Sequence, residues 1–192
     1  MKEFETERLK LIKPNQKYLE DFYHYAKKPN IGPMAGWPPH QNIAESKFIL
    51  EEMAKSDKTW SIIWKETDTL IGTIDLRPVD SFFVFKTTSY ELGYAIDDEY
   101  WGRGIVVEAA NLLLDYAFNE LRVKEVIVGH GEQNLQSKRV IEKLGFVFEK
   151  AEYEEQFRTY TNRMWRYKMS KYDYERRNIK WVRWVQNMIL KQ

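Results

Sequence analysis

The sequence predicts one domain of the α/β or α+β class, because runs with strand and helix patterns alternate along the chain. Its 192 residues suffice for a single domain with a sizeable core. Hydrophobic residues make up 43% and charged residues 31% of the chain, as in ordinary globular proteins. Neither an internal repeat nor a low-complexity segment interrupts the alternation.

The first half of the chain is expected to hold three strands and two helices. Residues 8–13 alternate leucines with charged neighbours, which is typical of a half-buried strand. Apolar residues recur at helical spacing in 16–28, and a second helix over 42–55 begins with an Asn-x-x-Glu capping box. The segments 59–65 and 70–77 flank the polar turn Glu-Thr-Asp-Thr and predict a β-hairpin.

The second half continues with strands and helices in turn and ends in a helix. Gly145 stands where a helix C-cap glycine belongs. The expected strands are 89–96, 123–129, 146–153 and 162–170, and the expected helices are 105–118, 136–144 and 173–190. With the three strands of the first half, the pattern predicts a seven-stranded sheet.

The C-terminal helix is basic and has a large apolar side. The net charge of +1 divides into −7 for residues 1–155 and +8 for residues 156–192. This end could bind nucleic acid or another acidic partner, but we expect it to neutralise the acidic body of its own fold. The apolar side must be covered by the domain's edge or by a second subunit of a homodimer; it comprises Trp181, Val182, Trp184, Val185, Met188 and Ile189. We therefore assign residues 171–192 to a basic amphipathic helix of the same domain as residues 1–170.

Residue types that the chain lacks exclude several classes of protein. Without cysteine it has no disulfide, no thiolate nucleophile and no cysteine zinc site, which fits a cytoplasmic setting. The N-terminus is too charged for a signal peptide, and no apolar run reaches membrane-spanning length. The histidines His24, His40 and His130 lack metal-ligand spacing, so we expect no metal site.

Two glycines, Gly102 and Gly104, stand directly before the expected helix 105–118. A helix start has unpaired N–H groups and a partial positive charge, and glycine lets an anion approach the backbone closely. Phosphate is the obvious ligand. Val107 stands where a dinucleotide fingerprint needs its third glycine, and no P-loop Gly-Lys-Ser/Thr follows. On this motif alone, a tight strand-to-helix turn without a ligand explains the glycines equally well.

A second motif, Asn-Leu-Gln-Ser at the start of residues 134–146 and Lys-Leu-Gly-Phe at their end, decides between these two interpretations. Together with residues 91–109, it resembles the GNAT N-acetyltransferase superfamily, and within it the branch similar to ribosomal-protein N-terminal acetyltransferases. The resemblance spans residues 5–170. The matching positions are Trp101, Gly102, Gly104, Val106, Glu108, Ala109, Asn134, Ser137, Lys143, Gly145 and Phe146.

The resemblance implies a GNAT-like fold with acetyl-CoA as cosubstrate. This fold is a twisted, mostly antiparallel sheet whose two central parallel strands splay apart, flanked by helices. Acetyl-CoA would lie in the splay, with its pyrophosphate on the backbone N–H groups of residues 102–106. Arg103 would add a charge-assisted contact, while the strand end and the Asn134 amide would bind the pantetheine arm. The expected cofactor-binding residues are Ile96, Gly102, Arg103, Gly104, Ile105, Val106, Asn134 and Ser137.

The catalytic residues are expected on the strand and helix beside the splay. Glu91 is the first candidate for the general base, acting through a water, because a half-buried carboxylate holds a proton more tightly than an exposed one; the alternative is a solvated strand glutamate. Ser137 would protonate the leaving thiolate, contact the pantetheine or cap its helix. Tyr94 is expected on Glu91's face of the strand, against the acceptor or in the core. Two positions depart from many family members: Val106 narrows the space beside the phosphate, and Ile141 replaces a tyrosine acid.

The acceptor side offers weaker signals. Four prolines and two glycines in residues 29–40 predict a loop, which resembles the acceptor-side loop of the branch. Trp37 and His40 would shape the acceptor pocket, unless Trp37 only anchors the loop. His130 lies near the strand end where the cofactor arm would pass and is a second candidate base. Glu108 could meet the acceptor amine, but we expect it to stabilise the helix dipole.

These features predict an N-acetyltransferase that transfers acetyl from acetyl-CoA to a primary amine, either a protein N-terminus or a small-molecule amine. Without cysteine, direct attack in a ternary complex is the natural scheme, and alignment of amine and thioester supplies much of the rate. The alternative is a catalytically weak acyl-CoA-binding sensor with the same fold, which the missing tyrosine acid supports. The expected partners are acetyl-CoA and the amine acceptor, and neither a membrane nor nucleic acid.

Overall fold

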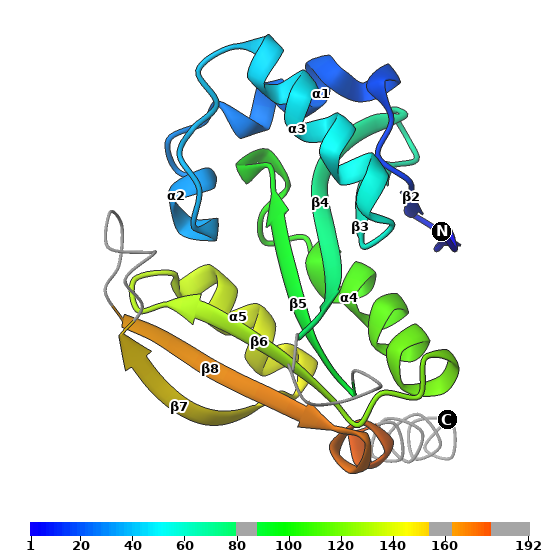
Figure 1. The fold of residues 1–192 in the computed structure, drawn as a ribbon, viewed down its shortest axis with the longest axis vertical. Coiled ribbons are helices and arrows are strands. Elements are labelled where there is room, and N and C mark those ends of the chain that lie inside the picture. Colours follow the sequence, from blue (N-terminus) through cyan, green and yellow to red (C-terminus); the bar gives the residue numbers. More distant parts are fainter. Residues whose placement is uncertain (80–87, 154–162, 178–192) are drawn as a thin grey trace, which may run out of the picture.

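A computed structural model describes residues 1–79, 88–153 and 163–177, which form one eight-stranded sheet flanked by helices (Figure 1). The strand order across the sheet is β1-β2-β3-β4-β5-β6-β8-β7. The strands are β1 (Phe4–Glu5), β2 (Leu9–Ile12), β3 (Thr59–Trp64), β4 (Thr69–Pro78), β5 (Ser89–Ile96), β6 (Glu125–Gly131), β7 (Val147–Tyr153) and β8 (Arg163–Ser170). The seven predicted strands are confirmed, and the two-residue β1 is added at the edge, where the alternating pattern is too short to detect.

Two of the helices have the caps that the sequence predicts. The Asn42 side chain accepts a hydrogen bond from the Glu45 N–H at 3.0 Å, as the capping box predicts, while the Glu45 carboxylate binds the Gln41 N–H rather than that of Asn42. Gly145 ends its helix in the left-handed conformation. The helices are α1 (Leu19–Ala26), α2 (Gly32–Ala35), α3 (Ile43–Ser56), α4 (Ile105–Asp115) and α5 (Leu135–Leu144), with the short turns η1 (Gln16–Tyr18), η2 (Asp98–Tyr100) and η3 (Tyr116–Glu120).

The proline-rich segment is predicted to be a loop, but it also contains α2, which makes one helical turn. Pro33 lies in the first turn of α2, where a proline costs no hydrogen bond, and Gly36 ends the turn in the left-handed conformation. The prolines that predict a break in regular structure therefore also start a short helix.

The central pair of strands is parallel and forks. All other neighbouring strands pair antiparallel, whereas β5 and β6 run parallel and pair only from Ser89↔Glu125 to Glu91↔Ile127. Beyond these residues the two strands diverge, with β4 and β5 on one arm and β6 and β8 on the other (Figure 1). The expected splay is confirmed.

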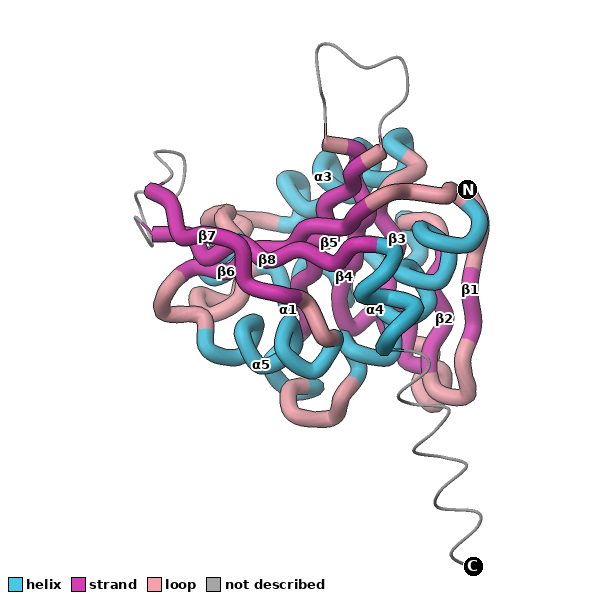
Figure 2. Tube along the Cα trace, turned by 90° about the horizontal axis from the view of Figure 1, so that it is seen from below, coloured by secondary structure: helices cyan, strands magenta, loops and turns pink. Residues whose placement is uncertain are grey.

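The two faces of the sheet have separate cores. The larger core packs α4 and α5 against one face, and it includes Leu92 of β5. Figure 2 shows α4 and α5 on the same side of the band of strands. The second core packs α1 and α3 against the other face and includes Ala95 of β5. Alternate residues of β5 therefore belong to different faces, as the two-residue repeat of a strand requires.

The beginning of the C-terminal segment packs onto the domain. Residues 171–177 are helical, and Tyr174 is buried and stacks on Phe118 with ring centres 4.8 Å apart. Arg177 donates a hydrogen bond to the Leu144 carbonyl at 2.9 Å. The apolar residues from Trp181 to Ile189 lie outside the described residues, so the assignment of 171–192 and the homodimer stay predictions. Among the described helices, none has the length and apolar character needed to cross a membrane.

Candidate active site

A cavity of about 1080 Å³ opens at the fork of the sheet. On one face it is bounded by the starts of α4 and α5, and on the other by α2 and the end of α3. Between them, the cavity runs past β4, β5, β6 and β8. It therefore connects the two faces of the sheet where β5 and β6 separate.

The start of α4 presents free backbone donors to this cavity. Gly102 and Gly104 have φ values of +76° and +73°, and nothing lies within 4 Å of a Cβ built on either. Because the first helical bond runs from the Glu108 N–H to the Gly104 carbonyl, the N–H groups of residues 105–107 have no helical partner. Ile105 and Val106 also line the cavity, with buried side chains in the larger core. The arrangement suits a phosphate.

Among the expected cofactor residues, Ile96 and Arg103 have other partners in this structure. Ile96 lines the cavity, but its carbonyl accepts a hydrogen bond from Trp101 Nε1 at 3.1 Å. Arg103 does not line the cavity: its guanidinium lies 5.1 Å from the centre of the Tyr100 ring, and its carbonyl accepts bonds from Arg8. A phosphate contact from Arg103 requires this side chain to leave Tyr100.

The start of α5 carries two hydrogen-bonded side chains. Asn134 uses Oδ1 to cap the Ser137 N–H at 3.0 Å and donates from Nδ2 to the Met34 carbonyl at 3.0 Å. Asn134 is therefore the N-cap of α5, and the expectation that Ser137 caps this helix is wrong. The bond from Asn134 to Met34 links α5 to α2 across the mouth of the cavity. Ser137 is buried, and its hydroxyl lies 2.8 Å from the Tyr94 hydroxyl. Burial raises the pKa of Tyr94, so its phenol keeps a proton at neutral pH.

Tyr94 and Glu91 lie on opposite faces of β5, so the expectation that they share a face is wrong. They are three residues apart, and a strand alternates its side chains with a period of two. Tyr94 points to α5, whereas Glu91 pairs across the sheet with Arg77 of β4 and binds Arg166 of β8.

The other face of the fork carries two carboxylates, Asp75 and Glu91. Glu91 Oε1 accepts a hydrogen bond from Arg166 at 2.8 Å. Asp75 lies opposite Gly93 in the β4–β5 register, and its Oδ2 is 2.6 Å from Arg77 Nε. Burial raises the pKa of Asp75 to about 6; Arg77 opposes this rise and the charge of Glu91 adds to it.

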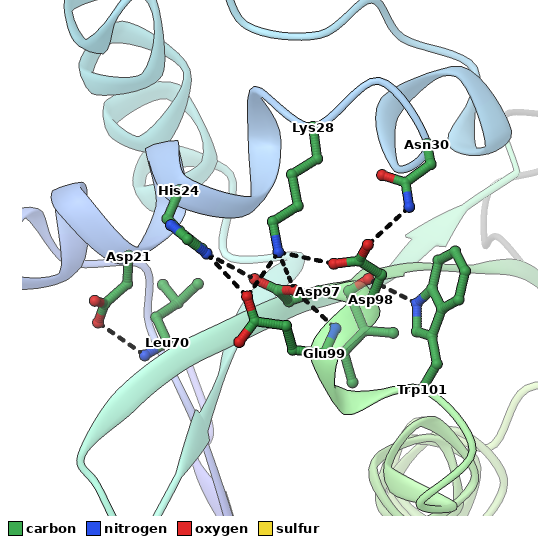
Figure 3. A network of polar contacts seen from close by, with 10 residues as sticks. Asp21, His24, Lys28, Asn30, Leu70, Asp97, Asp98, Glu99 and Trp101 are labelled. Atoms are coloured by element: carbon green, nitrogen blue, oxygen red, sulfur yellow. Dashed lines mark hydrogen bonds and ion pairs between the residues drawn. The ribbon is translucent and has the colours of Figure 1, made fainter.

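A network around Lys28 holds the segment between β5 and α4 (Figure 3). Lys28 Nζ lies 2.6 Å from Asp97, 2.7 Å from Asp98 and 3.2 Å from Glu99. Burial disfavours the charge of Lys28, but these hydrogen bonds outweigh it and raise its pKa. His24, Asp97 and Glu99 also bring possible ligand atoms within 4.8 Å of one another, and Lys28 Nζ lies against both carboxylates of this cluster. The network ties the end of α1 to the loop that precedes α4.

The family comparison agrees with this geometry. The sequence profile described as "Acetyltransferase (GNAT) domain" matches residues 8–147. The chain belongs to the GNAT acetyltransferase family. It is therefore an acetyl-CoA-dependent acyltransferase.

Individual GNAT proteins are similar over different lengths. The chain is 36% identical over 106 residues to the "Probable N-acetyltransferase YjcK" of Bacillus subtilis, a match that covers 53% of this chain and 57% of that protein. A solved GNAT acetyltransferase from Bacillus anthracis has a TM-score of 0.79 at 20% identity, covering 88% of this chain and 99% of the other. The ribosomal-protein-S5-alanine acetyltransferase of Vibrio fischeri has a TM-score of 0.67 at 20% identity, covering 89% and 97%. The last two matches show the shared fold.

The remaining predicted residues of this GNAT protein divide between the cavity and the core. Trp37 lines the cavity and also packs on Gly32 of α2, so both of its expected roles are compatible with its position. His40 is buried with Nδ1 2.7 Å from Ser46 Oγ and does not line the cavity, so the expectation that it shapes the pocket is wrong. Glu108 accepts hydrogen bonds from Thr6 and Arg8 and does not line the cavity, so it does not contact an acceptor bound there.

His130 and Ile141 have structural positions. His130 lines the cavity, but its Nδ1 is 2.7 Å from the Gly131 carbonyl and its Nε2 is 3.2 Å from the Tyr167 hydroxyl. Burial lowers the pKa of His130, so the ring is neutral and both nitrogens are engaged. Ile141 is fully buried in the larger core, where a tyrosine acid would stand in many family members.

The sequence analysis missed Asp75 and the link from Asn134 to Met34. A single carboxylate within the apolar strand sequence Leu-Ile-Gly-Thr-Ile-Asp-Leu is a detectable signal, because burying a charge there is costly. No local pattern could reveal the second feature, because it joins residues 100 positions apart.

Proposed function

We propose that this protein transfers the acetyl group of acetyl-CoA to a primary amine, either a protein N-terminus or a small-molecule amine, by direct attack in a ternary complex. One observation carries the proposal: a single cavity reaches from the free N–H groups at the start of α4 to the carboxylates of Asp75 and Glu91 on the opposite face. The first end suits a pyrophosphate and the second an ammonium group. The thioester would lie between them, at the fork.

The cofactor end would be held mainly by backbone. Gly102 and Gly104 leave space beside the N–H groups of residues 105–107, so the phosphates can approach without meeting a side chain. Beyond Glu91, the edge of β5 that faces β6 has no strand partner, so the peptide-like amides of the pantetheine arm could pair with it. This arm would deliver the sulfur towards Tyr94 and Ser137.

The leaving thiolate requires a proton donor, and Tyr94 with Ser137 supplies one. Both side chains line the cavity, and their hydroxyls are hydrogen-bonded to each other. Because the phenol stays protonated, it can replace a proton that Ser137 gives to sulfur. This pair would take the place of the tyrosine acid that Ile141 excludes, and it argues against a catalytically weak sensor.

Among amines, a peptide N-terminus is the first class to test. An α-amine has a pKa of about 8 and loses its proton more easily than a lysine at about 10.4. The name of the Vibrio fischeri enzyme, which refers to an alanine of a ribosomal protein, supports the same choice.

The test measures thiol release from acetyl-CoA with three kinds of amine: peptides with a free N-terminal alanine, spermidine and an aminoglycoside. We expect at least one amine to raise thiol release above the rate without an amine. Gly104→Asp should remove that release because it disrupts the phosphate site. Tight acetyl-CoA binding in calorimetry without turnover of any amine would instead support the acyl-CoA sensor.

A further inference from the structure

We propose that Asp75 is the group that takes the proton from the acceptor ammonium, with Glu91 as its positioning partner. The inference rests on the proposed amine acetylation and assigns the base to a residue of β4, not to Glu91 itself. Three features support it: the place of Asp75 at the fork, the contacts of its oxygens and the charges around it.

Asp75 lies where the sheet opens. Its register partner Gly93 is two residues beyond Glu91, the last residue of β5 that pairs with β6. A Cβ built on Gly93 would lie 2.6 Å from Asp75 Oδ1, so the carboxylate occupies the space that this glycine leaves. Gly129 occupies the matching position on β6, two residues beyond Ile127, and both glycines line the cavity. An amine that reaches the thioester through the fork must pass this carboxylate.

The two carboxylates differ in what holds their oxygens. Asp75 Oδ2 is buried and accepts no hydrogen bond of good geometry from the described residues, but it lies 2.6 Å from Arg77 Nε in an ion pair. In Glu91, by contrast, Oε1 accepts the bond from Arg166, and Oε2 lies 3.7 Å from Arg77. Arg77 is the cation that pairs with Asp75, and a substrate ammonium would be a second positive charge beside this carboxylate.

The surroundings of Asp75 raise its pKa towards neutral pH. Arg77 flanks it on β4, Glu91 lies on β5, and Arg166 of β8 is shared by Glu91 and Glu152. Glu52, from α3, lines the same cavity. Burial and the Glu91 charge outweigh Arg77 and give Asp75 a pKa of about 6. A base with this pKa is ionised at neutral pH and still accepts a proton readily.

The proton balance of the reaction then closes within the site. The ammonium gives one proton to Asp75, and the freed nitrogen lone pair attacks the thioester carbonyl carbon. The C–N bond forms and the C–S bond breaks, with the bonding pair leaving on sulfur. The thiolate takes a proton from the hydroxyl of Ser137, Tyr94 replaces that proton, and the second proton lost by the nitrogen restores the Tyr94 phenol. Asp75 afterwards releases its proton to solvent.

The experiment compares Asp75→Asn with Glu91→Gln, using the peptide, spermidine or aminoglycoside that the wild type acetylates fastest. For Asp75→Asn we expect kcat to fall about 100-fold. In a plot of kcat/KM against pH, the rising limb at about pH 6 that comes from Asp75 should disappear. The remaining pH dependence should follow the fraction of the amine that is unprotonated. For Glu91→Gln we expect a smaller fall, with the rising limb moved to lower pH because the charge that raises the pKa of Asp75 is gone. Acetyl-CoA affinity and melting temperature, measured on both variants, should match the wild type.

The possible outcomes separate this inference from the proposed function. If the wild type acetylates an amine and folded Asp75→Asn keeps both its rate and its rising limb, Asp75 is not the base. If Glu91→Gln removes the limb and Asp75→Asn does not, the base is Glu91. If the wild type acetylates none of the amines, the proposed function fails and this inference with it. Should Asp75→Asn lose stability, Asp75→Ser, which fills less space and has no charge, must show the same loss of the limb.

Discussion

The two walls of the cavity are built in different ways. The wall at the start of α4 and α5 comes from two continuous stretches of sequence, and backbone N–H groups and caps dominate it. The opposite wall gathers single side chains from α2, β4, β5 and β8. Among them, Asp75 pairs with Arg77, and Glu91 binds Arg166. Backbone sites depend on local conformation, whereas side-chain sites depend on register between strands. The two walls should therefore respond differently to mutation.

The largest effect is expected on the backbone wall, from Gly104→Asp. The new carboxylate would face the pyrophosphate at the helix start, and like charges at this distance repel strongly in a partly dry cavity. We expect no measurable acetyl-CoA binding by calorimetry. Gly104→Ala is the control: it has the same strained φ of +73° but meets no atom within 4 Å and adds no charge, so its affinity should fall less than about tenfold. Equal losses in both variants would show that strain, not charge, controls the site.

The network that ties the end of α1 to the loop before α4 can be broken with Lys28→Met. This change leaves Asp97, which is only 5% exposed, without its cation and should lower the free energy of unfolding by about 3 kcal/mol. Lys27→Met removes the same charge from an exposed neighbour and should change stability by less than about 0.5 kcal/mol. Denaturant unfolding of both variants measures the difference.

The same pair of variants also makes a prediction about pH. The hydrogen bond from Lys28 is the main reason that the pKa of Asp98 and of Glu99 is lowered. Groups with a lowered pKa in the folded state stabilise the fold above their unfolded pKa and lose this contribution as the pH falls. Wild-type stability should therefore fall as the pH drops below about 4, and the Lys28→Met curve should be flatter there. Parallel curves would show that these carboxylates do not depend on Lys28.

The side-chain wall can be disturbed without removing any charge, by Gly93→Ala. The added methyl group would lie 2.6 Å from Asp75 Oδ1, so the flexible carboxylate must turn away while the strand remains. A displaced base should lower kcat about tenfold at an unchanged acetyl-CoA affinity. An unchanged kcat in a folded variant would argue that the position of Asp75 is not needed.

The smallest effect is expected where the walls touch, at Asn134. Asn134→Ala removes both the helix cap and the bond to the Met34 carbonyl, and it should cost about 1 kcal/mol of stability. Asn134→Asp keeps the capping oxygen but loses the donor to Met34, so its stability should be nearly normal. If the link positions α2 for the acceptor, both variants should raise the KM of the amine severalfold. A rise in the alanine variant alone would assign the effect to the cap.

The sequence by itself determined the secondary structure and the backbone wall. The glycines before α4, the Asn42 cap and Gly145 act through φ values and hydrogen bonds within a few residues, so their spacing alone predicts their conformation. In the same way, the alternation of apolar and polar residues predicts the strands of the sheet, and the helical spacing of apolar residues predicts the helices that cover it. For the proline-rich segment, the prediction of a loop is wrong only in the one helical turn of α2, and a proline can itself begin such a turn.

Only the tertiary structure decided which side chains share the acceptor wall. Asp75 and Gly93 meet through the register of β4 and β5, Glu91 and Arg166 meet from strands far apart in the chain, and Tyr94 faces α5 because it is an odd number of residues from Glu91. The local pattern contains none of these pairings, since they follow from how the strands align and where β5 and β6 part. Register is a property of the assembled sheet, and a shift by one residue would turn every one of these side chains to the other face.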